Sequence, residues 1–158
     1  MMPASSVLEV LDALSVSGCP AWILGGWGVD ALVGRQTRPH RDLDLAIDAG
    51  QEVAALTALA ALGFVVETDW RPIRVELRAP PSLFVDVHPV AFDAEGNGRQ
   101  AGPDGTFYEY PKGCFTTGCI AGVPVACATV ALQLVGHTGY EPRDVDRHDL
   151  DLLQNLRG

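Results

Sequence analysis

The stretch that decides the fold is Ala21-Trp22-Ile23-Leu24-Gly25-Gly26, which is followed further along the chain by Asp42-Leu43-Asp44-Leu45-Ala46-Ile47. The apolar run before the glycines predicts a short buried strand, and residues 27–32 predict a helix that ends at Gly34. Glycine between a strand and a helix lets backbone N–H groups come close to a ligand, and the helix N-terminus favours an anion. The sequence therefore predicts a phosphate site at Gly25 and Gly26.

The second half of this stretch predicts a pair of carboxylates on one strand face. Side chains alternate along a strand, so Asp42 and Asp44 share a face while Leu43 and Leu45 point into the core. Two adjacent carboxylates repel each other unless a proton or cation lies between them, and hard oxygen ligands suit Mg²⁺. The alternative is an exposed strand edge with solvated charges.

Composition indicates a compact domain without a membrane span. The chain has 158 residues, of which 47% are hydrophobic, and this fits one packed domain over residues 1–158. Its apolar runs fall short of the roughly 18 residues that a membrane span needs, and residues 1–6 lack the basic start of a signal peptide. We therefore expect a cytoplasmic location.

The four cysteines are irregularly spaced and form no Cys-x-x-Cys pair, so they indicate neither a zinc site nor a disulfide framework. We expect reduced, mostly buried thiols at Cys19, Cys114, Cys119 and Cys127.

Net charge helps to define the partner. The formal charge of −9 argues against a general nucleic-acid binder, which needs a basic patch to neutralise phosphates. An acidic surface favours a cationic small molecule, although solubility accounts for the charge equally well.

The remaining pattern predicts a mixed α/β (α+β) chain whose C-terminal part is helical. Ser5 or Ser6 is the expected N-cap of the first helix, and residues 93–105 are expected to form a loop because glycine and proline recur among polar residues. We expect helices over 5–17, 51–62, 128–135 and 145–156, strands over 64–67, 73–78 and 83–88, and an edge strand over 122–125.

Three motifs carry a resemblance to a known family. They are Gly25-Gly26-Trp27-Gly28-Val29-Asp30, Thr37-Arg38-Pro39-His40-Arg41-Asp42-Leu43-Asp44 and Val85-Asp86-Val87-His88-Pro89. In order and spacing the chain resembles the small antibiotic nucleotidyltransferases, and most of all the lincosamide nucleotidyltransferases. The segments 123–127, 137–140 and 146–149 extend the likeness over nearly the whole chain. The resemblance implies a mixed sheet with flanking helices, a core over about residues 1–92 and an acceptor-side segment over about residues 106–158.

The resemblance also implies the chemistry. Asp42, Asp44 and Asp86 would bind Mg²⁺, with two ions expected, and a nucleoside triphosphate, with ATP favoured, would donate its nucleotidyl group to an antibiotic hydroxyl as pyrophosphate leaves. A lincosamide is the first choice of acceptor and an aminoglycoside the main alternative. A toxin-antitoxin nucleotidyltransferase acting on protein or RNA, and a catalytically silent binding module, are further alternatives. The resemblance permits a homodimer, and we expect neither a nucleic-acid nor a membrane partner.

The acceptor hydroxyl must lose a proton, so a general base is expected. Asp86 is the first choice, although metal binding would lower its basicity. Glu76 is the second choice, and it could instead form an ion pair with Arg74 or Arg78, which share its strand face.

The nucleotide site is expected to include several further side chains. Arg38, His40 and Arg41 are candidates for phosphate contact because they precede the aspartates, although Arg41 could instead pair with a nearby aspartate. Trp27 is a candidate base-stacking surface, with core packing as its alternative.

The acceptor pocket is expected to include His88, Tyr140 and Asp146. His88 could equally be a structural residue. Tyr140 and the acidic helix after it could hold a cationic drug, whereas capping of the helix N-terminus explains Asp146 without a ligand.

Overall fold

The strands that carry the aspartates lie side by side in the middle of the sheet. In a computed structural model, which describes residues 1–157, β2 (Asp42–Asp48) and β5 (Leu83–Phe92) run parallel. The sheet order is β3-β4-β5-β2-β1-β9-β8. The other strands of this path are β1 (Ala21–Leu24), β3 (Val65–Trp70), β4 (Arg74–Ala79), β8 (Phe115–Ile120) and β9 (Val123–Ala128). The expected mixed α/β fold is confirmed.

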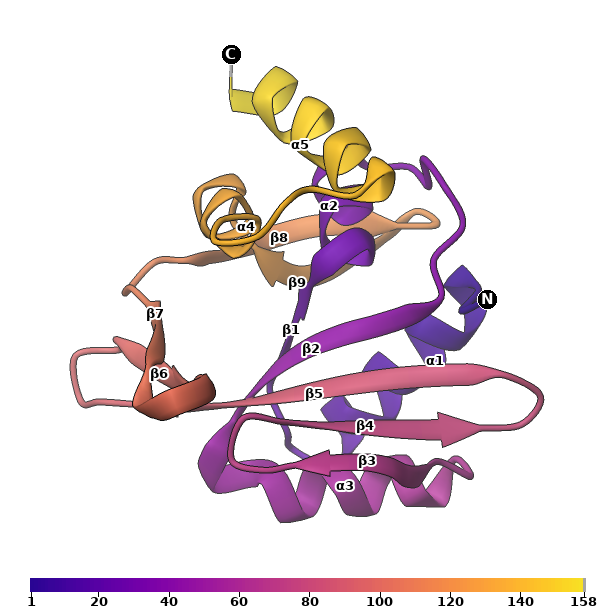
Figure 1. Cartoon of the computed structure of the whole chain (residues 1–158). Helices are drawn as coiled ribbons and strands as arrows, with labels where there is room; N and C mark the ends of the chain where they lie inside the picture. Colours follow the sequence, from indigo (N-terminus) through magenta and orange to yellow (C-terminus); the bar gives the residue numbers. More distant parts are fainter. Residues whose placement is uncertain (158) are drawn as a thin grey trace.

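The helices form two groups. Helices α1 (Ala4–Val16) and α3 (Glu52–Ala61) contact each other and cover one face of the sheet (Figure 1). Helices α2 (Gly25–Val33), α4 (Val130–Gly136) and α5 (Asp144–Arg157) pack on one another near β8 and β9. Short 3₁₀ turns occupy Ala49–Gln51 and Pro103–Gly105. No helix among residues 1–157 combines the length and apolar character needed to cross a membrane.

The alternation predicted for β2 is confirmed. Leu43, Leu45 and Ile47 are fully buried, whereas Asp42 and Asp44 on the other face are partly exposed. The buried leucines pack in the main core with side chains from α1 and α3. Hydrophobic burial thus holds the strand in a register that keeps both carboxylates on the opposite face. The expected burial of the cysteines is also confirmed, since Cys19, Cys114 and Cys127 are buried and Cys119 is partly exposed.

Several expected boundaries were wrong. The first helix begins after Pro3, and no side chain caps it, so neither Ser5 nor Ser6 is its N-cap. The glycines form no separate turn, because α2 begins at Gly25 directly after β1. The predicted edge strand belongs to β9, which pairs with β1 on one side and β8 on the other.

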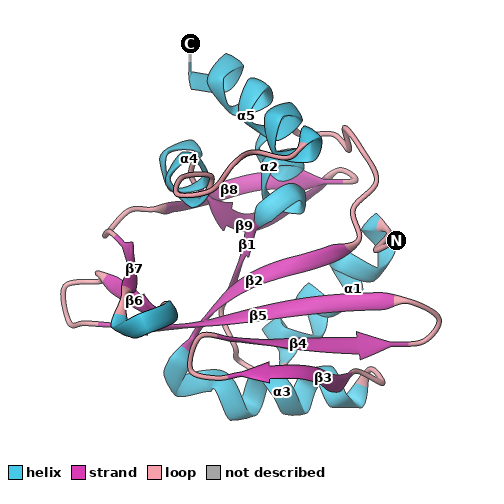
Figure 2. Ribbon diagram, viewed as in Figure 1, coloured by secondary structure: helices cyan, strands magenta, loops and turns pink. Residues whose placement is uncertain are grey.

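The predicted loop over residues 93–105 contains a strand. β6 (Gly98–Ala101) pairs with β5 and with β7 (Phe107–Tyr110), as Figure 2 shows. Gly98, which indicated a loop, is needed for close packing, because a Cβ there would lie 2.6 Å from Val90 Cγ1. Tertiary pairing therefore overrides the local turn composition.

Candidate active site

Three aspartates meet where β2 and β5 run side by side. The parallel register places Asp44 directly beside Asp86, and strand alternation puts His88 on the same face. Asp44, Asp86 and His88 each offer a ligand atom, and these atoms lie within 4.8 Å of one another. This carboxylate cluster, defined as Asp44 and Asp86 with Asp42 beside them, is the candidate catalytic centre.

Asp86 carries the most unusual environment. Its Oδ2 accepts a hydrogen bond from Arg74 on β4, whereas its buried Oδ1 contacts no hydrogen-bond donor among residues 1–157. Burial, with a contribution from Asp44, raises the pKa of Asp86 to about 6 although His88 and Arg74 act in the opposite direction. A buried carboxylate oxygen without a partner, next to a second carboxylate, fits a bound hard cation or a proton.

Asp42 lies at the edge of the cluster. Its Oδ2 is 2.9 Å from Nη1 of Arg41, which also lies 3.2 Å from Glu76 Oε2. Burial and the charge of Asp44 raise the pKa of Asp42, and Arg41 partly offsets this rise. Glu76 therefore has an ion-pair partner, which is Arg41 and neither of the two arginines expected from its own strand.

His88 contacts Asp44 on β2 and Gln100 on β6. Its Nε2 lies 3.2 Å from Asp44 Oδ1, and its Nδ1 lies 3.0 Å from Nε2 of Gln100 on β6. Burial lowers the pKa of His88, but the hydrogen bond to Asp44 and the Asp44 charge outweigh it, so the pKa is raised. Sequence reasoning missed Gln100, because it lies in the segment that was expected to be a loop.

The two glycines let the N-terminus of α2 approach the carboxylate cluster. Gly25 has φ +60, and a Cβ at this residue would collide with the Asp44 carboxylate. A Cβ at Gly26 would collide with His40 and would lie 2.6 Å from Arg38 Nη2. The glycine pair therefore permits close backbone approach, and the helix N-terminus that it opens favours negative charge.

Three of the proposed nucleotide contacts have partners inside the protein. Trp27 is 2% exposed, and its Nε1 donates to the Met2 carbonyl oxygen. His40 is 3% exposed, with Nε2 at 2.5 Å from Asp30 Oδ2. The Arg38 guanidinium donates to both carboxylate oxygens of Asp149, at 3.0 and 2.7 Å. Trp27 and His40 thus lie in the interior, where core packing and a buried hydrogen bond to Asp30 account for them.

Asp30 ends the first of the three motifs but was given no role from sequence, and it joins α2 to the segment before β2. Burial acts to raise the pKa of Asp30, but hydrogen bonds from His40 and Thr37 outweigh it, so this pKa is lowered. Thr37 Oγ1 also lies 3.0 Å from His148 Nε2 on α5. These contacts hold the segment that leads into Asp42.

Tyr140 and Asp146 lie at the start of α5. The backbone N–H of Arg143 donates to Asp146 Oδ2 at 2.8 Å, and the Arg143 side chain donates to the same carboxylate. The Arg143 hydrogen bonds lower the pKa of Asp146 to about 2 although burial opposes them. Tyr140 is 46% exposed. Asp146 thus caps the helix, which is the ligand-free explanation of this residue, and Tyr140 faces solvent.

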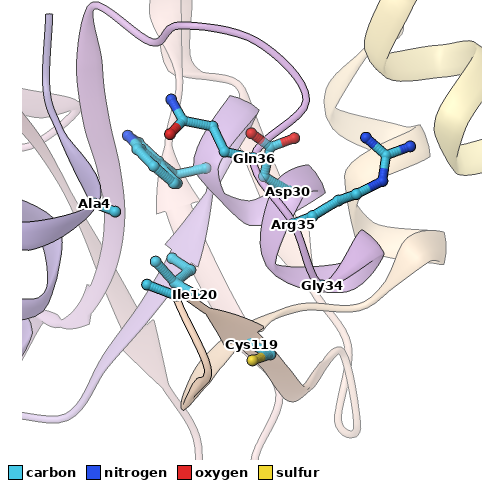
Figure 3. Close-up of a pocket in the computed structure, with 9 residues that line it drawn as sticks. Ala4, Asp30, Gly34, Arg35, Gln36, Cys119 and Ile120 are labelled. Atoms are coloured by element: carbon cyan, nitrogen blue, oxygen red, sulfur yellow. The ribbon is translucent and has the colours of Figure 1, made fainter.

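Two hollows lie away from the carboxylate cluster. One of about 310 Å³ is lined by Trp27, Asp30 and Cys119 among others (Figure 3). A larger one of about 760 Å³ lies between α1 and β9, with Leu8, Leu11 and Val125 in its lining. Neither is lined by Asp44, Asp86 or His88. The candidate centre is therefore identified by its oxygen and nitrogen ligand atoms and not by the volume of a hollow.

Known antibiotic resistance proteins resemble the chain in sequence. A lincosamide resistance protein of Staphylococcus haemolyticus is 31% identical over 95% of this chain and 91% of its own length. A 2''-aminoglycoside nucleotidyltransferase of Escherichia coli is 31% identical over 75% of this chain and 63% of its own length.

Solved structures agree with this likeness. The lincomycin-bound lincosamide antibiotic adenylyltransferase LnuA superimposes with a TM-score of 0.88 at 30% identity, covering 98% of both chains. ANT(2'')-Ia in complex with adenylyl-2''-tobramycin has the same fold, with a TM-score of 0.80 at 21% identity over 98% of this chain and 89% of that one.

The family model described as aminoglycoside-2''-adenylyltransferase matches residues 6–153. The paired aspartates, the glycines that open α2 and these matches lead to one conclusion: the chain belongs to the aminoglycoside-2''-adenylyltransferase family of antibiotic nucleotidyltransferases.

Proposed function

We propose that the protein transfers a nucleoside monophosphate from a nucleoside triphosphate, with ATP favoured, to a hydroxyl of a lincosamide, in a Mg²⁺-dependent reaction that releases pyrophosphate. The observation that carries this proposal is the buried Asp86 Oδ1, which has no partner among residues 1–157 and lies beside Asp44. The donor set fits a hard divalent cation.

The carboxylates are proposed to hold the cation. Asp44 and Asp86 provide the core of its site, and Asp42 completes it once Arg41 turns away. Bound Mg²⁺ would neutralise triphosphate charge and stabilise the departing pyrophosphate. Because Arg41 is 56% exposed, its guanidinium can move from Asp42 to a phosphate, and this mobility supports its proposed role in nucleotide binding.

The backbone is proposed to help bind the triphosphate. Gly25 and Gly26 present the N-terminal N–H groups of α2, which suit phosphate oxygens. Arg38, His40 and Trp27 are proposed to support the nucleotide site indirectly, without contacting the nucleotide. The Arg38–Asp149 and His40–Asp30 pairs hold the segment before β2, while Trp27 packs beneath it.

Asp86 is proposed as the general base. In the metal-free protein the pKa of Asp86 is about 6, which suits proton transfer near neutral pH, and a cation bound beside it would lower this pKa. Glu76 is engaged by Arg41, which makes it the weaker candidate. Arg74 contacts the other Asp86 oxygen and would stabilise the ionised form.

A lincosamide is the preferred acceptor because the lincosamide resistance protein is matched over 91% of its length, against 63% for the aminoglycoside enzyme. The family description keeps an aminoglycoside as the second candidate. Tyr140 is the proposed acceptor-side contact, since its ring is exposed beside the acidic start of α5.

The acceptor is tested by mass spectrometry of lincomycin, clindamycin and kanamycin after incubation with the protein, Mg²⁺ and each nucleoside triphosphate. The proposal predicts a nucleotidyl mass increase on a lincosamide, largest with ATP. An increase on kanamycin alone would transfer the assignment to aminoglycosides. Asp44→Asn is the inactive control and should fold like wild type. If folded wild type modifies no drug either, the proposed acceptor class is wrong, and protein or RNA acceptors are tested next.

A further inference from the structure

Gln100 is a buried polar residue next to the carboxylate cluster. It is 4% exposed on β6 and contacts His88, Ile73 and Tyr110. We propose that Gln100 is a positioning residue that fixes the tautomer of the neutral His88 ring, so that Nε2 carries the proton and donates to Asp44. The effect of Gln100 on turnover rests on the proposed nucleotidyl transfer. The His88 tautomer does not depend on that proposal.

The orientation of the Gln100 amide follows from its partners. The carbonyl oxygen of Ile73 lies 3.0 Å from one end of the amide, and a carbonyl can only accept, so that end must be the NH₂ group. The Tyr110 hydroxyl lies 2.7 Å from the other end and donates to Oε1. A flipped amide would set two oxygen atoms against each other at Ile73. Ile73 and Tyr110 thus hold the amide in one orientation.

The amide orientation determines which nitrogen of the His88 ring is unprotonated. The NH₂ group has two protons, and one of them is used by Ile73. The other is directed at His88 Nδ1, 3.0 Å away, so Nδ1 must supply a lone pair. A neutral imidazole has one N–H. The remaining proton therefore sits on Nε2, which lies 3.2 Å from Asp44 Oδ1 and donates to it.

With the proton on Nε2, His88 differs from the neighbouring carboxylates in that it is not a metal ligand. Asp44, Asp86 and His88 are close enough to share a cation, but a histidine binds a metal through a bare nitrogen. For His88 to bind a metal through Nε2, its proton would have to move to Nδ1, where it would face the Gln100 NH₂ group. His88 therefore orients Asp44 as a hydrogen-bond donor and leaves the carboxylates as the oxygen ligands. Loss of such an outer contact costs about 10- to 100-fold in metal affinity or activity.

The tautomer is tested by long-range ¹H–¹⁵N correlation spectra of the ligand-free full chain labelled with ¹⁵N-histidine. The spectra are recorded at increasing pH until the His88 signals report a single ring proton. His88→Gln identifies the His88 signals by their loss. We expect a pyridine-type Nδ1 and a pyrrole-type Nε2, distinguished by their couplings to the ring protons. A pyrrole-type Nδ1 in the wild-type protein would overturn the proposal.

Two variants test whether Gln100 is the cause. Gln100→Glu replaces the donor at Nδ1 by an acceptor of similar size. Because the ring then lies between two carboxylates, we expect Nδ1 to gain a proton and become pyrrole-type while Nε2 stays pyrrole-type, and turnover to fall about 10- to 100-fold. Arg99→Gln is the matched control on the same strand, because Arg99 is exposed and pairs with Glu109; its His88 spectrum should match wild type. An unchanged His88 spectrum in folded Gln100→Glu contradicts the proposal.

The wild-type spectrum remains decisive if Gln100→Glu fails to fold. Because no nucleotide or drug is present in these spectra, failure of the tautomer assignment is distinguishable from failure of the proposed transfer reaction, which the drug-modification experiment reports.

Discussion

The environment of Asp86 lowers the free energy of unfolding of the protein in two ways that a purely structural residue would avoid. Its Oδ1 is buried without a donor among residues 1–157, and its carboxylate lies beside that of Asp44. Burying an unpaired polar atom and placing like charges together both cost folding free energy. Such groups concentrate at functional sites, where a ligand compensates them.

Asp86→Asn tests this argument. We expect turnover to fall by about 10²- to 10⁴-fold, the range associated with loss of a general base. The thermal unfolding midpoint should be unchanged or higher, because repulsion with Asp44 is removed. Asp48→Asn is the matched control on β2, since Asp48 accepts a hydrogen bond from Gly50 far from the cluster. Near-normal turnover in folded Asp86→Asn would eliminate Asp86 as the base.

Comparing Gly25 with Gly34 distinguishes the cost of a positive φ from the cost of a steric collision with Asp44. Both have positive φ, but a Cβ at Gly34 meets nothing within 4 Å, whereas one at Gly25 collides with Asp44. Gly34→Ala should cost about 1–2 kcal/mol of stability and leave turnover per folded molecule unchanged. Gly25→Ala should lower stability further and abolish turnover. Urea unfolding and steady-state kinetics measure both effects, and equal turnover in the two variants would contradict the placement of α2.

At the scale of elements, the start of α5 depends on one charged cap. Asp146 accepts from the backbone and side chain of Arg143, and α5 contacts α2, the helix whose N-terminus faces the carboxylate cluster. Arg38 and Asp149 add a second link between α5 and the segment before β2. Loosening α5 is therefore expected to weaken the support of that segment.

The Asp146 cap predicts a specific pH dependence of stability. Its pKa falls from 3.8 to about 2 in the folded protein, so the unfolded chain takes up the proton first as pH falls. The stabilising contribution is therefore complete above about pH 4 and is lost as pH falls toward 2. Urea unfolding should show a stability difference between wild type and Asp146→Asn that shrinks over this interval. A difference that stays constant would contradict the assignment of the cap.

At the scale of the whole molecule, local pattern predicted the centre of the sheet better than its extension. Leucines that alternate with aspartates specify both the face and the register of β2, because a shift of one residue would bury Asp42 and Asp44. The same alternation placed Asp86 and His88 on one face of β5. The carboxylate cluster could therefore be anticipated from two short motifs and the resemblance.

Long-range contacts decided what the pattern missed. Gln100 belongs to a four-residue strand whose pairing with β5 and β7 cannot be read from its own composition. The burial of His40 depends on Asp30 in another element, and Glu76 pairs with Arg41, which lies before β2. The spacing of residues along the chain carries no information about such partners, so sequence reasoning missed Gln100 and could not identify the partners of His40 and Glu76.

The carboxylate cluster is proposed to catalyse cation-dependent nucleotidyl transfer. The most direct measurement follows the transfer of ³²P from α-labelled ATP to lincomycin by wild type and by Asp86→Asn, each with Mg²⁺ and with EDTA. We expect rapid labelling of lincomycin only with wild type and Mg²⁺. Labelling that persists in EDTA, or in folded Asp86→Asn at the wild-type rate, would contradict it.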